Sequence, residues 1–257
     1  MLHHVSLLAE TLDLSYEEQG SGQPYLLLHG GAGPASLAGL AAALARSGRV
    51  ILPTHPGFGG QPRPAWLRSV PALATAYLAL LEQLDLHEVV VVGNSVGGWL
   101  AAELGLRASP RIAALVLLNA VGLDPTAESG PIADPTALTP AARAAAAFHD
   151  PTRYALAPPT AEAAATMAAN QVALRAYAGT PFMHDPALRT QLPALQLPTL
   201  VLWGVSDRIV TPAYGRQFAN LIPQARFELV NAAGHFPQIE QLGDVLEQLR
   251  QFQAGMG

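Results

Sequence analysis

The chain of 257 residues contains no cysteine, which excludes disulfides, thiolate zinc sites, iron–sulfur clusters and a cysteine nucleophile. It also contains no lysine, because all 14 of its basic residues are arginine. A P-loop lysine, a Schiff-base lysine and a Ser-Lys dyad are therefore excluded by composition. The side chains therefore cannot act through a thiolate or a lysine amine.

Positive charge and long hydrophobic segments are scarce as well. The net charge is −5 and the sequence has no basic run, so it lacks the electrostatic footprint that nucleic-acid binding requires. Half of the residues are hydrophobic, yet no apolar segment approaches the length of about 18 residues that spans a bilayer. We therefore expect a protein that binds neither nucleic acid nor membrane and acts on a small-molecule substrate, with a homodimer left open.

The first residues and the histidines bear on location and on metals. Residues 1–5 lack a basic segment ahead of an apolar one, which predicts no signal peptide and a cytoplasmic protein. The only closely paired histidines are His3 and His4, and we interpret this pair as an exposed terminus. We expect neither a metal site nor a cofactor.

The spacing of apolar segments predicts a single large α/β domain, for which 257 residues are sufficient. Residues 5–18 alternate in places and predict a β-hairpin. Continuous apolar segments, typical of buried parallel strands, lie at 25–28, 50–52, 89–92, 114–118, 200–203 and 227–230. Segments long enough for crossover helices lie at 35–47, 65–84, 96–108, 212–221 and 239–252. The pattern predicts a doubly wound, mostly parallel sheet.

One interval breaks this alternation. Residues 123–197 contain no strand-like segment, but they include two Ala-rich helical stretches, at 141–148 and 161–177. We interpret the interval as a helical cap over the carboxyl edge of the sheet, inserted into a core formed by 1–122 and 198–257. A disordered linker is the alternative, although structureless stretches of that length are uncommon in compact domains.

A candidate nucleophile follows the strand at 89–92. Four valines there lead into the pentapeptide Gly93-Asn94-Ser95-Val96-Gly97, which a helix follows. Strand, sharp turn and helix form the context in which Gly-x-Ser-x-Gly acts as a nucleophile elbow. The glycines permit close backbone packing, and the start of the helix directs free N–H groups toward a developing oxyanion. We therefore predict Ser95 as the nucleophile and the Val96 N–H as one oxyanion donor.

A glycine-rich loop upstream supplies a candidate for the second donor. Acyl transfer needs another backbone N–H, and in the sequence His29-Gly30-Gly31-Ala32-Gly33 we choose that of Gly31. A dinucleotide-binding loop is the competing interpretation, but the spacing Gly-x-Gly-x-x-Gly is not met. We assign His29 a structural hydrogen-bonding role at the end of its strand.

Two further side chains complete a candidate triad. Asp207 follows the strand at 200–203, and His235 lies in a loop after the strand at 227–230. The order Ser95, Asp207, His235 is the order of α/β-hydrolases and differs from that of chymotrypsin and subtilisin. A helix-capping role is the alternative for Asp207. Asp124, which follows the strand at 114–118, is a competing candidate for the acid.

Taken together, these motifs resemble the α/β-hydrolase family over nearly the whole chain. Within that family, His-Gly-Gly-x-Gly followed by Gly-Asn-Ser-x-Gly-Gly is similar to carbon–carbon bond hydrolases of ring-cleavage products and to related esterases. The resemblance implies that Gly30, Asn94 and Phe236 lie beside the substrate. Dehalogenase-like and epoxide-hydrolase-like relatives carry Asp at the elbow, so Ser95 argues against both.

The sequence departs from the carbon–carbon hydrolases at three places. Phe236 stands where they usually carry Trp after the catalytic His. Their cap arginine has no clear counterpart. Thr54 stands at the usual acid position of an Asp-x-x-Gly-x-Gly loop, with His55 beside it. The candidates for the cap arginine are Arg143, Arg153 and Arg175.

We predict a serine hydrolase that cleaves a carboxylic ester of a small or medium lipophilic substrate. Three enzymatic alternatives stay open, namely a carbon–carbon bond hydrolase, a cofactor-free haloperoxidase-like enzyme and an acyltransferase-like enzyme. A ligand-binding, receptor-like protein of the same fold is the alternative outside enzymes, because fold alone does not determine function.

Overall fold

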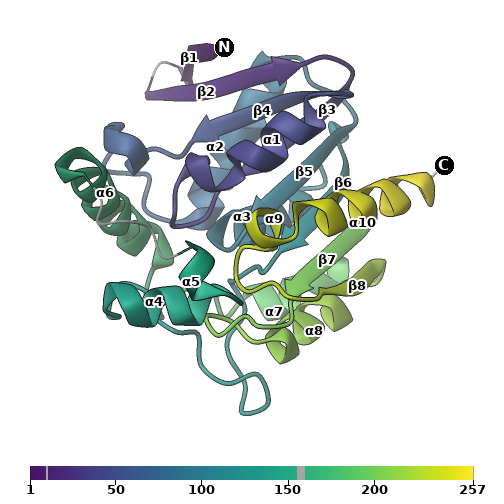
Figure 1. Cartoon of the computed structure of the whole chain (residues 1–257). Helices are drawn as coiled ribbons and strands as arrows, with labels where there is room; N and C mark the ends of the chain where they lie inside the picture. The colour runs from purple at the N-terminus through teal and green to yellow at the C-terminus, as the bar shows by residue number, and fades with distance from the viewer. Residues whose placement is uncertain (10, 155–159, 257) are drawn as a thin grey trace.

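The computed structural model describes residues 1–9, 11–154 and 160–256. Its centre is one eight-stranded sheet in the order β1-β2-β4-β3-β5-β6-β7-β8 (Figure 1). The strands β1 and β2 form an antiparallel hairpin, β2 pairs antiparallel with β4, and all other neighbours are parallel. The strands are β1 (Leu2–Leu7), β2 (Leu12–Gly20), β3 (Gln23–Leu28), β4 (Gly48–Thr54), β5 (Val89–Asn94), β6 (Ile112–Leu118), β7 (Thr199–Gly204) and β8 (Ala225–Val230). The predicted hairpin and the mostly parallel sheet are confirmed.

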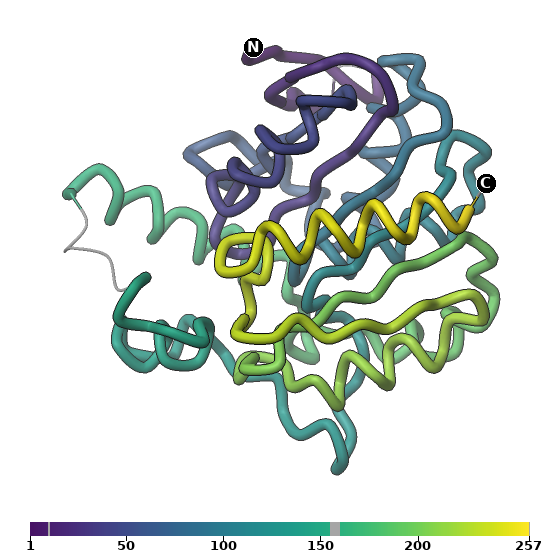
Figure 2. The backbone as a smooth tube through the Cα atoms, turned by 45° about the vertical axis from the view of Figure 1, so that its right-hand side comes forward, coloured from purple at the N-terminus to yellow at the C-terminus, as the bar shows by residue number. Residues whose placement is uncertain are grey.

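Helices cover both faces of the sheet (Figures 1 and 2). One face carries α1 (Ala38–Leu44), α9 (Pro237–Glu240) and α10 (Leu242–Ala254), and the other carries α2 (Val70–Gln83), α3 (Val96–Leu106) and α8 (Pro212–Leu221). Successive residues of β3 illustrate the division, because Leu27 packs on the first face whereas Leu26 and Leu28 pack on the second. The two apolar clusters that result bury the inner parallel strands on both sides, as their continuous hydrophobic sequences require, whereas the edge strand β8 is only partly buried.

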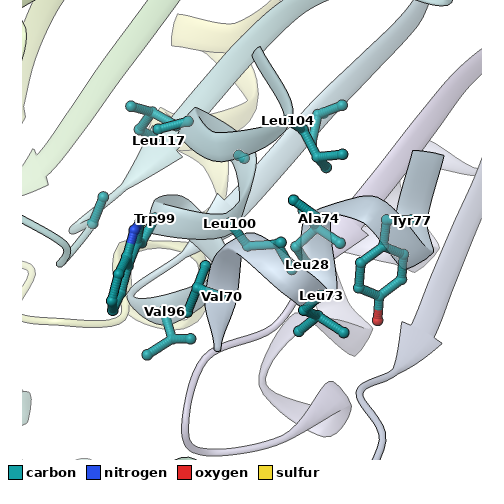
Figure 3. Close-up of a cluster of buried hydrophobic side chains, with 14 of the residues drawn as sticks. Leu28, Val70, Leu73, Ala74, Tyr77, Val96, Trp99, Leu100, Leu104 and Leu117 are labelled. Atoms are coloured by element: carbon teal, nitrogen blue, oxygen red, sulfur yellow. The ribbon is translucent and has the colours of Figure 1, made fainter. Parts of the chain in front are cut away.

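The larger cluster fixes the element that carries the elbow. In Figure 3, Leu73 of α2, Leu100 of α3 and the strand residues Leu28 and Leu117 lie together between the helices and the sheet. All four are fully buried. Burial of a leucine side chain contributes about 1.5–3 kcal/mol, so this packing holds α3, and with it the end of β5, firmly against the sheet.

Three predicted helices have different bounds for local reasons. The helix expected at 65–84 begins only at Val70, because the Ser69 hydroxyl accepts the Ala72 N–H and Pro71 occupies the first turn. The segment 239–252 is divided into α9 and α10 at Gln241, whose backbone is not helical. The segment 35–47 is divided into a 3-10 turn, Pro34–Leu37, and α1.

Residues 123–197 supply three short helices and one long helix beside the carboxyl edge of the sheet (Figures 1 and 2). These are α4 (Pro140–Ala147), α5 (Pro151–Tyr154), α6 (Ala161–Ala178) and α7 (Leu188–Gln191), with a 3-10 turn at Leu192–Ala194. The two Ala-rich stretches are therefore helical, as predicted. The Asn170 Oδ1 of α6 accepts the Gly59 N–H, which ties α6 to the 3-10 turn Phe58–Gly60 of the core. The division into core and cap at 122 and 198 stays a prediction.

Within the described residues, no helix combines the length and the apolar character needed to cross a membrane.

Candidate active site

Ser95 lies at a sharp turn between β5 and α3. Its backbone has φ 58° and ψ −118°, a strained conformation for a residue with a side chain. The turn requires glycine on both sides. A Cβ on Gly93 would lie 2.0 Å from the Gly97 carbonyl oxygen, and a Cβ on Gly97 would lie 1.9 Å from that of Leu28. The expected elbow geometry is present.

The backbone of Ser95 is fully bonded whereas its hydroxyl is free. The N–H donates to the Leu118 carbonyl at 2.9 Å, and the carbonyl accepts N–H groups from Gly98, Trp99 and Val121. The hydroxyl makes no hydrogen bond to any residue in the described ranges, and 5% of Ser95 is exposed. The backbone bonds therefore fix the main chain of Ser95, whereas its hydroxyl makes no hydrogen bond to His235 or to any other residue in those ranges.

His235 and Asp207 form a buried pair. His235 Nδ1 lies 2.8 Å from Asp207 Oδ2, and both side chains are almost fully buried. The other oxygen, Oδ1, accepts the N–H groups of Ile209 at 2.8 Å and Val210 at 3.1 Å. Because a carboxylate only accepts, the shared proton lies on Nδ1 of the imidazole, and Nε2 is left as the basic nitrogen.

A third side chain, Asn119, holds the acid in place and was missed by the sequence analysis. Its Nδ2 donates to Asp207 Oδ2 at 2.7 Å and to the Gly234 carbonyl at 3.3 Å, and its Oδ1 accepts the Gly204 N–H. Asn119 is the first residue after β6, and its place there at the strand edge is the one signal that could have drawn attention to it.

Asp124, the competing candidate for the acid, forms an ion pair with Arg189. Its Oδ1 accepts the Arg189 Nε–H at 2.6 Å, and the Asp124 side chain is 40% exposed. Asp207 instead contacts His235 directly. The geometry therefore favours Asp207 as the acid.

Asn94 lies beneath the elbow. Its Nδ2 donates to the carbonyl of Leu118 at 3.1 Å and to that of His235 at 3.0 Å, and the residue is fully buried. Its Oδ1 has no hydrogen-bond partner within the described part of the chain. These contacts connect the elbow to the histidine loop. They do not support the predicted contact of Asn94 with substrate, because the side chain has no exposed surface.

The two predicted oxyanion donors carry free N–H groups. Neither the Gly31 N–H nor the Val96 N–H donates to a residue in the described ranges. The loop before Gly31 touches the elbow, because a Cβ on Gly30 would lie 2.9 Å from the Ser95 Cβ. Gly31 itself is covered by the cap residue Leu174, whose Cδ2 lies 2.7 Å from the place of a Cβ on Gly31. Free donors and an apolar cover thus lie beside the nucleophile.

The carboxyl end of α4 contacts the two loops that carry Asp207 and His235. The Ala146 carbonyl accepts the Arg208 N–H at 3.0 Å, and the Ala147 carbonyl accepts the His235 N–H at 2.7 Å. Glu240 reinforces this joint, since its Oε2 accepts the Gly234 N–H at 2.6 Å and its Oε1 accepts the His149 N–H at 2.9 Å. This role of Glu240 was not predicted from its sequence context.

Phe236 packs between the catalytic histidine and the segment after α4. Its ring centroid is 5.2 Å from that of His235 and 5.4 Å from that of Phe148. The side chain is half-buried. A contact of Phe236 with substrate stays a prediction.

The three candidate arginines make local contacts, although the buried Arg143 Nε has no hydrogen-bond partner among the described residues. The Arg143 guanidinium donates to the Leu138 carbonyl and that of Arg175 donates to the Thr136 hydroxyl. Arg153 lies over the ring of Tyr154. In the described residues, no cluster of three or more His, Cys, Asp or Glu side chains is arranged to hold a metal ion.

A groove adjoins the glycine loop. It has a volume of about 410 Å³ and lies between Ala32 and the cap helix α6, which contributes Ala163, Met167 and Asn170 to its wall. Pockets for small organic molecules begin at about 300 Å³, so the groove is large enough to admit one.

The sequence matches the family model for the alpha/beta hydrolase fold over residues 24–242. The chain belongs to this family. A curated relative, the 2-hydroxymuconate semialdehyde hydrolase of Pseudomonas putida, is 31% identical to this hydrolase over 91% of the chain and 88% of the relative. Another curated relative, a 2-hydroxy-6-oxo-2,4-heptadienoate hydrolase from a different P. putida strain, is 36% identical over 46% of the chain and 44% of the relative.

Solved structures agree with this hydrolase in fold. A variant of the meta-cleavage product hydrolase from Pseudomonas fluorescens IP01 has a TM-score of 0.80 at 22% identity, with 99% of this chain and 98% of that chain covered. A thermophilic esterase from Thermogutta terrifontis has a TM-score of 0.74 at 24% identity, with 100% and 99% covered. At these identities the likeness shows the fold alone, so the reaction must be argued from the site.

Proposed function

We propose that this alpha/beta hydrolase cleaves carboxylic esters through an acyl-enzyme on Ser95. The observation that carries the proposal is the buried hydrogen bond between His235 Nδ1 and Asp207 Oδ2, in a chain whose elbow serine has a free hydroxyl. An imidazole oriented in this way through Nδ1 has its Nε2 available as a general base, which a serine nucleophile needs.

In the first half-reaction, His235 Nε2 takes the proton from Ser95 Oγ as Oγ bonds to the ester carbonyl carbon. The carbonyl oxygen becomes an oxyanion, which accepts the N–H groups of Gly31 and Val96. Collapse of the tetrahedral intermediate breaks the bond to the alcohol oxygen, and the alcohol leaves with the proton held by His235. The acyl group stays on Ser95.

In the second half-reaction, water gives a proton to His235 and its oxygen attacks the acyl carbon. The new intermediate releases the carboxylic acid and returns the proton to Ser95 Oγ. Asp207 accepts the Nδ1 hydrogen throughout and stabilises the imidazolium that forms twice in the cycle.

The surroundings support a small or medium lipophilic acyl substrate. Leu174 lies against Gly31, Phe236 packs next to His235, and Phe148 packs against Phe236. The adjoining groove of about 410 Å³ includes Met167 in its wall. The support for an apolar ligand comes from Leu174 and the aromatic rings, because four of the seven residues that line the groove are polar, namely Thr160, Glu162, Thr166 and Asn170.

Carbon–carbon bond hydrolysis is the second candidate. The observation in its favour is the 31% identity over 91% of the chain to the 2-hydroxymuconate semialdehyde hydrolase. Against it, Phe236 replaces the tryptophan expected from the resemblance. The Arg175 guanidinium donates to the Thr136 hydroxyl, whereas Arg143 Nε has no hydrogen-bond partner among the described residues.

One set of assays separates these reactions from each other and from a binding protein without turnover. A fluorophosphonate probe is expected to label the wild type but not Ser95→Ala. Hydrolysis is then measured with p-nitrophenyl esters of increasing acyl length and with a vinylogous diketone acid. Turnover of the esters alone supports the proposal, and faster turnover of the diketone acid would favour carbon–carbon cleavage. An unlabelled wild type without turnover would refute both.

A further inference from the structure

Two histidines that the proposed reaction does not use are buried behind the glycine loop. His29 follows β3 and His55 follows β4, and both residues are fully buried. Their rings are in contact and tilted, with centroids 3.8 Å apart and planes inclined by 31°. Tyr77 of α2 lies at the edge of the neighbouring apolar cluster (Figure 3) and brings its hydroxyl to His55.

The hydrogen bonds of His29 determine its tautomer. The backbone N–H of His55 points at His29 Nε2 at 3.0 Å, and a backbone N–H can only donate, so Nε2 is an acceptor. His29 Nδ1 lies 2.8 Å from the Gly30 carbonyl oxygen, which can only accept, so Nδ1 carries the proton. The ring is therefore neutral and donates to Gly30.

The hydrogen bonds of His55 determine the opposite tautomer. His55 Nε2 lies 2.9 Å from the His29 carbonyl oxygen and must donate to it. His55 Nδ1 then accepts the hydroxyl hydrogen of Tyr77. Burial lowers the pKa of His29 to about 4, and burial together with His29 lowers the pKa of His55 well below its usual value. Both rings stay neutral at neutral pH.

These two rings hold two successive peptide units of the glycine loop. The unit that contains the His29 carbonyl is held by His55, and the unit that contains the Gly30 carbonyl is held by His29. The second carbonyl also accepts the Gly33 N–H at 3.1 Å, which closes the turn. A trans peptide unit is planar, and its C=O and N–H point in opposite directions. The Gly30 carbonyl and the Gly31 N–H belong to one unit, so fixing the first fixes the direction of the second.

We propose that His29 and His55 are positioning residues that aim the Gly31 N–H at the oxyanion, with Tyr77 setting the tautomer of His55. The inference rests on the proposed function, because it gives the Gly31 N–H an oxyanion to stabilise. Donation by His29 to the Gly30 carbonyl also polarises the same peptide unit, which strengthens the Gly31 N–H as a donor.

Two substitutions of His29 separate its effect on the direction of the Gly31 N–H from its effect on packing. His29→Asn keeps an amide nitrogen close to the place of Nδ1 and loses the acceptor for the His55 N–H. His29→Gln keeps an acceptor near the place of Nε2 and loses the donor to the Gly30 carbonyl. Each variant thus retains one hydrogen bond, and only His29→Asn retains the one that fixes the Gly31 peptide unit.

Esterase kinetics and the melting temperature Tm are measured for both variants. For His29→Gln we expect kcat to fall about tenfold or more with KM within about twofold of the wild type, because a misdirected donor weakens transition-state binding. His29→Asn is expected to restore most of kcat even where its Tm falls. Equal losses of kcat in both variants, or full kcat in His29→Gln, would overturn the proposal.

If His29→Gln does not fold, two tyrosine variants test the proposal instead. Tyr77→Phe removes the hydroxyl that sets the His55 tautomer, and Tyr214→Phe removes an equally buried hydroxyl that bonds the Leu123 backbone far from the loop. We expect a lower kcat for Tyr77→Phe alone, and equal kcat in the two variants would overturn the proposal. A wild type that no fluorophosphonate labels would refute the proposed function itself, whereas a labelled wild type with an unaffected Tyr77→Phe would refute only the positioning role.

Discussion

Asn119 donates to the same oxygen of Asp207 that faces His235, with Nδ2 at 2.7 Å and the imidazole Nδ1 at 2.8 Å. Asn119→Ala should therefore leave the carboxylate freer to turn away from the imidazole. A hydrogen bond to a charged group is worth about 1.5–3 kcal/mol, so we expect kcat to fall by about tenfold to a hundredfold. Steady-state kinetics with a p-nitrophenyl ester will measure the change.

The matched control is Asp124→Asn, which removes a carboxylate paired with Arg189. Its kcat should stay near the wild-type value, whereas Asp207→Asn should lower kcat by orders of magnitude. If Asp124→Asn proves inactive and Asp207→Asn does not, the acid has been assigned to the wrong residue.

Glu240 joins the histidine loop to the segment after α4. Glu240→Gln should lower both stability and kcat, because the amide group has one acceptor oxygen for the two N–H groups of Gly234 and His149. Leaving a buried donor unpaired destabilises a protein by about 1–3 kcal/mol, which urea unfolding can resolve.

Glu247→Gln is the control for this substitution. Glu247 is exposed and pairs with Arg250 on the surface of α10, so its change should leave both the urea midpoint and kcat nearly unaltered. If the two substitutions change the urea midpoint and kcat equally, Glu240 does not help to hold the loop that carries His235.

The buried histidines predict that stability declines in mild acid. His29 has a pKa of about 4 in the folded chain and about 6.5 when unfolded, so between these values the unfolded chain binds more protons. The free energy of unfolding is then highest above pH 6.5 and falls by about 3 kcal/mol as the pH drops to 4. The lowered pKa of His55 acts in the same direction.

Urea unfolding at several pH values between 7.5 and 4.5 measures this slope. His29→Asn removes one titrating group from the folded interior and should flatten the slope. The lowered pKa values of Asp85 and Asp150 also favour unfolding in acid, but the variant leaves these carboxylates in place. An unchanged slope in His29→Asn would contradict the neutral, buried state of that ring.

Gly97 and Gly243 offer opposite outcomes for the same substitution. Gly97→Ala would place a Cβ 1.9 Å from the Leu28 carbonyl oxygen, so we expect a destabilisation of about 3 kcal/mol or more and loss of labelling at Ser95. Gly243→Ala meets no atom within 4 Å and lies in α10, where alanine should stabilise by about 0.5–1 kcal/mol. Thermal melts of the two variants will show whether the elbow tolerates any side chain there.

The sequence was sufficient to predict the elements whose cause is local. The valines of β5 and the glycines around Ser95 predict strand, turn and helix from neighbouring residues alone, and the structure has all three. Helix ends such as Gln241 depend on tertiary packing, so α9 and α10 could not be separated from periodicity.

Contacts between residues far apart in the chain could not be predicted from the sequence. Asn119 is 88 residues from Asp207, and Glu240 is 91 residues from His149. Neither residue belongs to a motif with fixed spacing. His55 was noted only as a departure from the family pattern, and its bond to the His29 carbonyl required coordinates.

The carbonyl groups of Ala146 and Ala147 limit where the segment 123–197 can be exchanged. Because these carbonyl groups accept the N–H groups of Arg208 and His235, α4 is a structural part of the loops that carry those two residues. If residues 123–197 were replaced by the corresponding segment of a related enzyme, the hydrogen bonds to the Ala146 and Ala147 carbonyl groups would be lost unless residues 145–150 were retained. Exchange of specificity by cap grafting is therefore expected to succeed at junctions C-terminal to Asp150 and to fail at the outer boundaries of the insertion.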